Sequence, residues 1–274
     1  APLVKLKDKL LEQNIIDKYE VLDILNTSYN QLFPRISKIE SIKQYIKTQD
    51  IKNLQSAIKN SKSRKLLIYG DSGIGKTSTL SSLQYFLQDD IVVIYDSFGA
   101  GTYKDDGEKR HKEKQIRTQI INEIAIRVGL NPYIENELVD LEEDFLRYLR
   151  IASTLLSKNK IIIVIDAADN NVEGALTFND EVFIPKLWSL NLPSNCYLIM
   201  SARGYRKELL KQTSEVEELK LRGFDKYSSI NLLLKFFPFV SKEFTTTFFT
   251  KTNGNPRVQN YVLQNTKNNY KKLQ

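Results

Sequence analysis

Apolar residues in the first part of the chain recur three to five positions apart, at Leu6, Leu10, Ile15, Tyr19, Leu22 and Leu25. This spacing predicts a helix over residues 1–31, because side chains at such intervals share one helical face. Pro34 interrupts the pattern. A second helix is predicted over 36–58, followed by a polar surface loop over 59–64.

After this loop, short apolar runs rich in β-branched residues alternate with helix-length segments. Strands are predicted at 65–69, 91–95, 161–165, 197–200 and 217–221, and helices at 76–88, 112–128, 138–157, 180–190 and 205–212. Such alternation predicts an α/β fold, a parallel five-stranded sheet with helices on both faces. The run Ile161–Ile165 has no polar positions, as expected of a strand buried on both faces.

The alternation ends near residue 222. Three short helices are predicted beyond it, over 226–237, 241–250 and 256–264. The chain is therefore expected to contain an N-terminal helical linker over 1–32, an α/β domain over 33–222 and a small helical domain over 223–274.

Composition narrows the possible functions. The chain has 274 residues, of which 41% are hydrophobic and 27% charged, and no apolar run approaches the length of a membrane span. Its start lacks the apolar run of a secretory signal. The single cysteine, Cys196, and the single histidine, His111, argue against disulfides, zinc sites and histidine-based triads. We expect a cytoplasmic protein with no membrane partner, and interpret His111 as a solvated or capping residue.

The net charge of +7 is unevenly distributed. Residues 1–70 carry +6, residues 71–220 carry −6 and residues 221–274 carry +7. This distribution argues against one broad nucleic-acid groove, although either basic end could contact phosphate, so the sequence leaves nucleic-acid binding open.

One motif carries specific chemistry. The predicted first strand is followed by a match to G-x-x-x-x-G-K-[ST], and the predicted nucleotide-binding residues are Gly70, Asp71, Ser72, Gly73, Ile74, Gly75, Lys76, Thr77 and Ser78. Glycines let such a loop point its N–H groups at phosphate oxygens, and a helix start adds its positive dipole end. Lys76 is predicted to reach the β- and γ-phosphates, and Thr77 to bind Mg²⁺.

A matching acidic residue follows the most apolar strand. Asp166 is predicted to hold Mg²⁺ together with Thr77, and Asp169 to orient or deprotonate the attacking water. The alternative for each is an aspartate that only caps a turn. The extra strand at 91–95, between the loop and Asp166, indicates the additional-strand P-loop NTPases, which include AAA+ proteins. No N-K-x-D guanine-reading motif follows Asp166.

At this point the sequence resembles the STAND class of signal-transducing NTPases (NACHT- and NB-ARC-like), and most closely its bacterial antiviral, Avs-type branch. The resemblance spans residues 33–264. It is carried, in this order, by Phe33-Pro34-Arg35, the phosphate loop, Tyr95–Tyr103 with Arg110-His111, Ile165–Asn170, Met200–Arg203 and Gly254–Gln259.

The resemblance implies roles for three further residues. Arg35 corresponds to an arginine near the nucleotide, Arg203 to a sensor of the γ-phosphate with a catalytic role, and Pro256 to a lid proline that packs on adenine. Arg203 could instead be a surface arginine, and Pro256 an ordinary first residue of a helix. We treat the G-x-G at Gly99 and Gly101 as a turn. Asn170 stands where many relatives have an acidic residue, which argues for weak water activation.

The resemblance also implies an Mg–ATP- or ADP-dependent switch that drives homo-oligomerisation, with effector and sensor domains on a longer chain or a partner. Two other functions remain open. One is a scaffold that holds nucleotide without hydrolysing it, which Asn170 favours. The other is a DNA-associated AAA+ ATPase, which the basic segment 221–274 favours.

Overall fold

The computed structural model describes residues 2–13, 15–37, 39, 46–60, 63–100, 109–134, 140–211 and 213–266. Parts of the predicted helix over 36–58, of the polar loop over 59–64 and of the glycine turn at Gly99 and Gly101 lie outside these residues.

Five parallel strands form one sheet, as the alternation of apolar runs predicted. Their order across the sheet is β2–β3–β4–β1–β5. The strands are β1 (Lys65–Gly70), β2 (Ile91–Asp96), β3 (Ile161–Asp166), β4 (Cys196–Arg203) and β5 (Glu217–Lys220). Every residue of β3 is buried, because helices cover both faces of the sheet.

The core therefore has two layers, one on each face of the sheet. Successive side chains of a strand point to opposite faces, so Leu66 packs in one layer and Leu67 in the other. The Leu66 layer includes side chains of α4 (Gln49–Asn60) and α5 (Lys76–Phe86), whereas the Leu67 layer includes side chains of α6 (Glu113–Val128), α7 (Leu141–Leu155) and α8 (Ala168–Thr177). Each fully buried aliphatic side chain stabilises the fold by about 1.5–3 kcal/mol.

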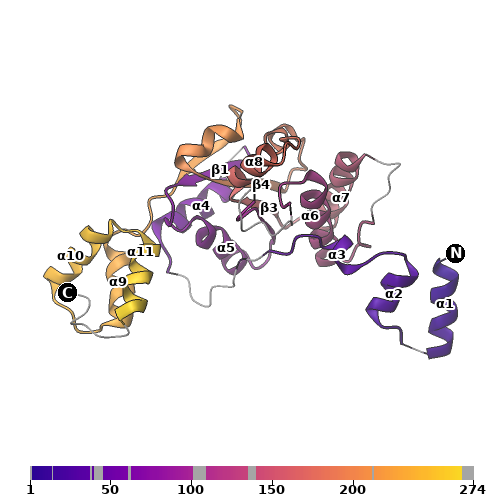
Figure 1. Ribbon diagram of the computed structural model, residues 1–274, viewed down its shortest axis with the longest axis horizontal. Coiled ribbons are helices and arrows are strands. Elements are labelled where there is room, and N and C mark those ends of the chain that lie inside the picture. The colour runs from indigo at the N-terminus through magenta and orange to yellow at the C-terminus, as the bar shows by residue number, and fades with distance from the viewer. Residues whose placement is uncertain are drawn as a thin grey trace.

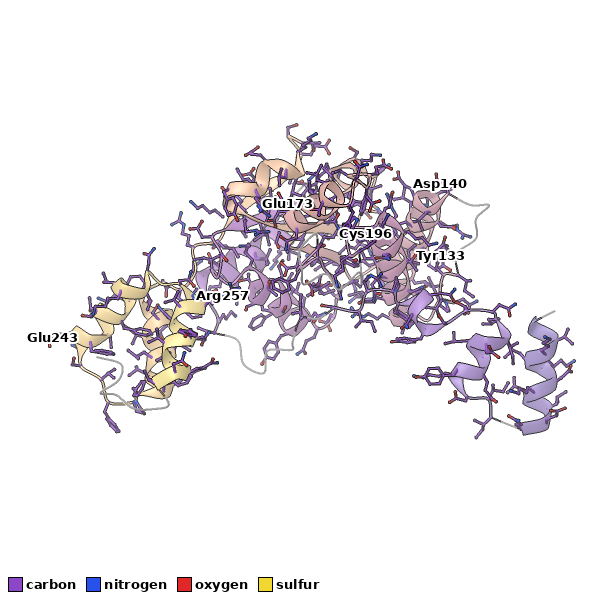
Figure 2. All side chains as sticks on the ribbon, in the orientation of Figure 1. Tyr133, Asp140, Glu173, Cys196, Glu243 and Arg257 are labelled. Carbon is purple, nitrogen blue, oxygen red and sulfur yellow. The ribbon has the colours of Figure 1, made fainter. Side chains whose placement is uncertain are left out.

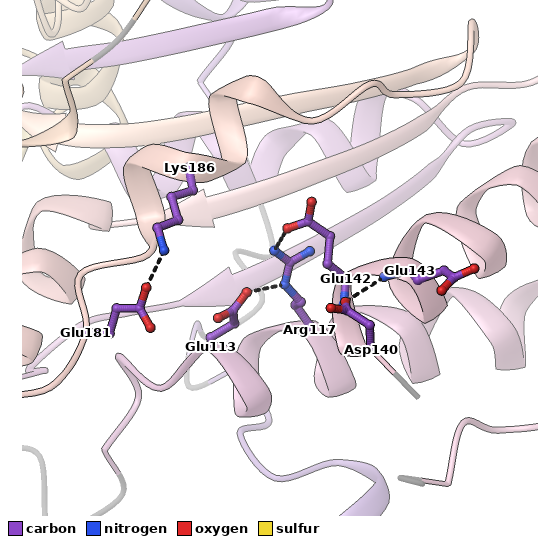
Figure 3. Close-up of polar contacts among 7 residues, drawn as sticks. All are labelled: Glu113, Arg117, Asp140, Glu142, Glu143, Glu181 and Lys186. Carbon is purple, nitrogen blue, oxygen red and sulfur yellow. Dashed lines mark hydrogen bonds and ion pairs between the residues drawn. The ribbon is translucent and has the colours of Figure 1, made fainter. Parts of the chain in front are cut away.

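A buried arginine joins α6 to α7. The Arg117 side chain is only 1% exposed; its Nε donates to Glu113 Oε1 and its Nη2 to Glu142 Oε2, both at 2.7 Å. Figure 3 shows Arg117 between these two carboxylates. At the start of α7, Asp140 accepts hydrogen bonds from the backbone N–H groups of Glu142 and Glu143, which caps the helix.

The prediction of one N-terminal helix over 1–31 was wrong. The segment forms three helices, α1 (Pro2–Gln13), α2 (Lys18–Ile24) and α3 (Tyr29–Leu32). Asp17 caps the start of α2 and Ser28 forms a capping box at the start of α3, so side chains that satisfy backbone N–H groups outweigh the continuous apolar spacing. In Figure 1, α1 and α2 lie to one side of the sheet.

The second predicted helix is shorter than expected. Of residues 36–58, the described ones are helical only from Gln49 onward, and the helix, α4, extends to Asn60. The Thr48 hydroxyl accepts from Ile51 N at 3.2 Å, a local bond typical of a helix start.

Between β3 and β5 the structure differs from the predicted helices in both type and number. Segments 180–190 and 205–212 form short 3₁₀ helices, η1 (Ile184–Ser189) and η2 (Gly204–Leu210). The α-helix α8, directly after β3, was not predicted. It begins after Ala167, which adopts a left-handed φ of 54°.

The three C-terminal helices form where they were predicted, as α9 (Lys226–Phe236), α10 (Lys242–Thr252) and α11 (Pro256–Thr266). We call them the helical lid. They enclose their own apolar cluster, made by Leu232, Leu233, Phe237, Phe248 and Leu263. Figure 1 shows the lid on the opposite side of the sheet from α1 and α2.

Within the described parts of the chain, no helix is both long enough and apolar enough to cross a membrane.

Candidate functional site

The glycine-rich loop joins β1 to α5. Gly73 and Gly75 have left-handed φ values of 77° and 98°, which residues other than glycine rarely adopt. Gly75 immediately precedes α5, so the loop curls directly into the start of the helix. This is the strand–loop–helix arrangement that the motif requires to bind phosphate.

Lys76 is held by the loop itself. Its Nζ donates to the carbonyl oxygens of Gly70 at 2.8 Å and Asp71 at 2.9 Å. Burial lowers the pKa of Lys76 below its ordinary value, while the nearby Asp166 opposes this effect. A triphosphate near the amine would strengthen its protonated form in the same way, because an opposite charge favours the charged state.

Thr77 and Asp166 meet, although they come from different elements. Thr77 Oγ1 donates to Asp166 Oδ2 at 2.6 Å, and Ser201 donates to the other carboxylate oxygen. Ala167 N in turn donates to Ser201 Oγ at 2.8 Å, which fixes that hydroxyl. Burial raises the pKa of Asp166. A hydroxyl and a carboxylate oxygen side by side fit Mg²⁺, which binds through one or two carboxylates and the substrate's phosphates.

Asp169 and Arg203 form an ion pair beside this centre. Arg203 Nε lies 2.6 Å from Asp169 Oδ2, and the Asp169 side chain is only 2% exposed. Arg203 Nη2 also donates to Asn170 Oδ1. The structure therefore brings the predicted water-activating residue, the predicted sensor and Asn170 into direct contact.

These residues surround a cavity of about 280 Å³. The predicted residues that line it are Ser72, Gly73, Gly75, Lys76, Thr77, Ser78, Asp166, Asp169, Arg203 and Pro256. Its other lining residues are Phe98, Ala167, Asn170, and Arg257 and Asn260 of α11. Figure 2 shows Arg257 where the lid meets the α/β domain. We call this the phosphate cavity.

A second cavity of about 300 Å³ shares Gly75, Ser78, Pro256 and Asn260 with the phosphate cavity. Its other lining residues are largely apolar: Ile46, Thr48, Asp50, Ile51, Ile74, Thr79, Gly223, Phe224, Leu232 and Lys235. An apolar cavity with a few polar groups, adjoining a phosphate site, suits the base of a nucleotide. Apart from Ile74, Gly75, Ser78 and Pro256, these residues could not be predicted from the sequence, because no motif marks them.

Asp50 ties the second cavity to the lid. Its Oδ2 accepts from the backbone N–H groups of Arg222 and Gly223, both at 2.9 Å. Burial raises the pKa of Asp50 above its ordinary value. The start of α4 and the chain entering the lid are thus joined through one carboxylate.

Arg35 does not reach the phosphate loop. It lines neither of these cavities but a separate one of about 620 Å³, with Lys112 and Lys114. Its backbone N–H donates to Gln119 Oε1 at 2.9 Å, which holds this segment against α6. Arg35 therefore does not line either cavity in which the nucleotide is expected to bind.

His111 is buried rather than solvated. It is 1% exposed, its Nε2 lies 2.7 Å from Asp180 Oδ2, and its ring stacks on Phe178. The His111 hydrogen bond, followed by that of Lys112, lowers the pKa of Asp180 to about 2. A hollow of about 1160 Å³ beside His111, between α6, α7 and residues 180–186, contains no phosphate-loop residue.

Solved structures with a similar fold were found. A Walker-type ATPase of Pyrococcus abyssi matches with a TM-score of 0.58 and 16% identity, over 85% of this chain and 71% of that one. A STAND protein with a tetratricopeptide repeat sensor from Pyrococcus horikoshii matches with a TM-score of 0.45 and 20% identity, over 83% of this chain. The Orc1 protein of Aeropyrum pernix, in complex with DNA, matches with a TM-score of 0.47 and 15% identity, over 81% of this chain.

The chain spans 32% of the length of the STAND protein and 60% of that of Orc1. No protein-family model and no curated protein matches the sequence. The parallel sheet, its flanking helices and the similarity to the Pyrococcus abyssi ATPase define the α/β fold of a P-loop NTPase.

Proposed function

We propose that this chain is the nucleotide-binding switch module of a STAND-type ATPase, which binds Mg–ATP and hydrolyses it slowly. The observation that carries the proposal is the Thr77–Asp166 hydrogen bond beside Lys76, inside a cavity closed by Pro256 of the lid. Lys76 suits the charge of a triphosphate, and Asp169 suits the role of a general base. Thr77 and Asp166 suit an Mg²⁺ ion.

In hydrolysis, water attacks the γ-phosphorus in line with the leaving oxygen, whose bond to phosphorus breaks to give ADP and inorganic phosphate. Asp169 orients the water and accepts its proton. Lys76 compensates charge that develops on the phosphate oxygens. Mg²⁺, when held by Thr77 and Asp166, supplies further charge neutralisation.

The switch consists of the contacts between nucleotide, Arg203 and lid. A γ-phosphate competes with Asp169 for the Arg203 guanidinium, and a base in the second cavity contacts Pro256. Nucleotide state thereby sets the position of the lid, and we propose that the ATP-bound arrangement favours homo-oligomerisation. The motif resemblance to Avs-type proteins supports a role in bacterial antiviral defence, with effector and sensor domains outside this chain.

The test is phosphate release from Mg–ATP by wild-type chain, by Lys76→Ala and by Lys158→Ala. Lys158 is an exposed lysine just before β3, so its substitution controls for loss of positive charge alone. We expect release by wild type and Lys158→Ala and none by Lys76→Ala. Equal release by all three would refute the proposed site.

A scaffold that holds nucleotide without hydrolysing it is the second candidate. Asn170, which lies in hydrogen-bond contact with Arg203, favours it, because an amide at this position cannot take a proton from water. Tight, Lys76-dependent ADP binding with no phosphate release would support the scaffold over the ATPase. Light scattering of the chain with ATP and with ADP would then test nucleotide-dependent assembly.

A further inference from the structure

The lid touches the phosphate loop directly through Asn255. This residue immediately precedes α11, and its Oδ1 accepts from Arg257 N at 3.0 Å and from Val258 N at 3.3 Å. Its Nδ2 donates across to Ser72 O in the loop at 3.1 Å. One side chain therefore caps the last lid helix and also binds the loop.

Only one orientation of the Asn255 amide makes all three bonds. With oxygen and nitrogen exchanged, two backbone donors would face an NH₂ group, and the Ser72 carbonyl would face an oxygen. The contact is also tight: a Cβ at Gly73 would lie 2.9 Å from Asn255 Oδ1 and 3.0 Å from Arg257 Cβ. Glycine at 73 is thus required by the lid as well as by the left-handed backbone.

A second hydrogen bond also joins the lid to the phosphate loop. Arg257 N donates to Gly73 O at 3.3 Å, so two successive loop carbonyls are bound from the lid side. In a trans peptide the carbonyl of one residue and the N–H of the next point in opposite directions, and the described residues contain no cis peptide. Holding Ser72 O and Gly73 O therefore turns the N–H groups of Gly73 and Ile74 away from the bonds that the lid makes.

These N–H groups belong to the loop that would bind phosphate. Among the described residues, Ile74 N makes only a long bond of 3.4 Å, to Asp71 O, and Gly73 lines the phosphate cavity. We propose that Asn255 is a positioning residue, which holds the Ser72 carbonyl so that the Gly73 amide is already aimed at the β-phosphate. This inference rests on the proposed nucleotide site and names the residue through which the lid acts on it.

The chain that enters the lid contacts the residue before Asn255. Phe224 N donates to Gly254 O at 2.9 Å, and a Cβ at Gly254 would lie 2.2 Å from Phe224 O. The residue before Asn255 is therefore packed against the chain that enters the lid. The loop, Asn255, the start of α11 and the chain that enters the lid therefore form one continuous set of contacts.

The discriminating variant is Asn255→Ser. Serine keeps an oxygen that caps α11, since it is among the preferred capping residues, but its side chain is too short to reach Ser72 O. Asn255→Ala loses both interactions and shows the cost of the cap. Hydrogen exchange of residues 256–266 reports directly whether α11 keeps its first turn in each variant.

The measurement is calorimetric titration of wild type and Asn255→Ser with ADP and with AMP, both in Mg²⁺. AMP has no β-phosphate, so a residue that aims the loop at this group affects ADP only. We expect ADP affinity to fall about three- to tenfold, the equivalent of one net hydrogen bond, and AMP affinity to change less than twofold.

Unchanged ADP affinity, or an equal loss for ADP and AMP, would overturn the inference, the latter because a general loosening of the lid affects both nucleotides. If wild type and Lys76→Ala both bind no ADP, the proposed function itself fails, and this inference with it. Normal, Lys76-dependent ADP binding by wild type with an unaffected Asn255→Ser variant would refute only the role of Asn255.

Discussion

The side chains of Thr77 and Asp166 are joined by a hydrogen bond of 2.6 Å, although the residues lie 89 positions apart. Thr77 lies in the first turn of α5, and Asp166 ends β3. Parallel strands end at the same edge of a sheet, so the phosphate loop after β1 and the aspartate at the end of β3 are brought to one place. This contact is the basis of the first prediction.

Thr77→Ala and Asp166→Asn should each remove the Mg²⁺ dependence of nucleotide binding. The former deletes the hydroxyl and the latter removes the charge that compensates the cation. Thr77→Ser keeps the hydroxyl and is the matched control. Nucleotide affinity is measured once with Mg²⁺ and once with a chelator. The two affinities should differ for wild type and also for Thr77→Ser, and they should be equal for Thr77→Ala and for Asp166→Asn.

The second prediction concerns the Asp169–Arg203 ion pair. Asp169→Asn should lower phosphate release about 10²- to 10⁴-fold, the usual contribution of a general base. It should not weaken ATP binding, because loss of the ion pair leaves Arg203 available to the γ-phosphate. Arg203→Ala leaves a buried carboxylate without its partner and should also lower the free energy of unfolding. Measurement of phosphate release and of chemical denaturation for both variants separates an effect on hydrolysis from an effect on stability. A phosphate-release rate unaltered by Asp169→Asn would exclude this residue as the base.

The third prediction is a pH dependence at Asp50. Because burial raises its pKa in the folded chain, Asp50 binds its proton more tightly when folded than when unfolded. Its contribution to stability is therefore greatest below the unfolded pKa and is lost as pH rises through the folded value. Asp50→Asn does not titrate, so its stability relative to wild type should rise with pH from the acid range upward.

Denaturation of both proteins between about pH 3 and pH 7 measures this difference, since the other titrating groups are common to both. A difference independent of pH would contradict the raised pKa. Asp50→Ala should be less stable than Asp50→Asn, because only the amide still accepts from Arg222 N and Gly223 N.

The fourth prediction compares two glycines with left-handed backbones. Gly129 has a φ of 72°, and no atom of the described residues lies within 4 Å of an added Cβ, so Gly129→Ala should cost only about 1–2 kcal/mol of backbone strain. Gly254 has a φ of 61°, and its Cβ would overlap Phe224 O. Gly254→Ala should cost about 1–3 kcal/mol more.

Denaturation of the two variants measures the costs, and limited proteolysis around residue 224 locates the damage. Gly254→Ala should expose this segment and weaken nucleotide binding, while Gly129→Ala leaves both unchanged. Equal stabilities for the two variants would show that the lid entrance tolerates a side chain.

The sequence alone determined the local features of the fold and of the site. Largely apolar runs of four or five residues predicted β1, β2, β3 and β4, because a strand buried on both faces has few polar positions. The fifth strand, β5, is mostly polar and exposed, so its prediction has weaker support in the hydrophobic pattern. The glycine spacing and Lys76 identified the phosphate loop, since the backbone conformation of such a loop is encoded within a few residues. Asp166 was predictable because it directly follows the most apolar strand.

Tertiary contacts decided the rest. The apolar spacing of residues 1–31 did not reveal that Asp17 and Ser28 start new helices, because capping competes with continuation of the helix. The position of Arg35 against Gln119 and the burial of His111 beside Asp180 depend on how distant segments pack. The same holds for Asn255 and Ser72, which lie 183 residues apart, so no local sequence pattern predicts their contact. Sequence periodicity reports which face of an element is buried, but only packing determines which residues meet across it.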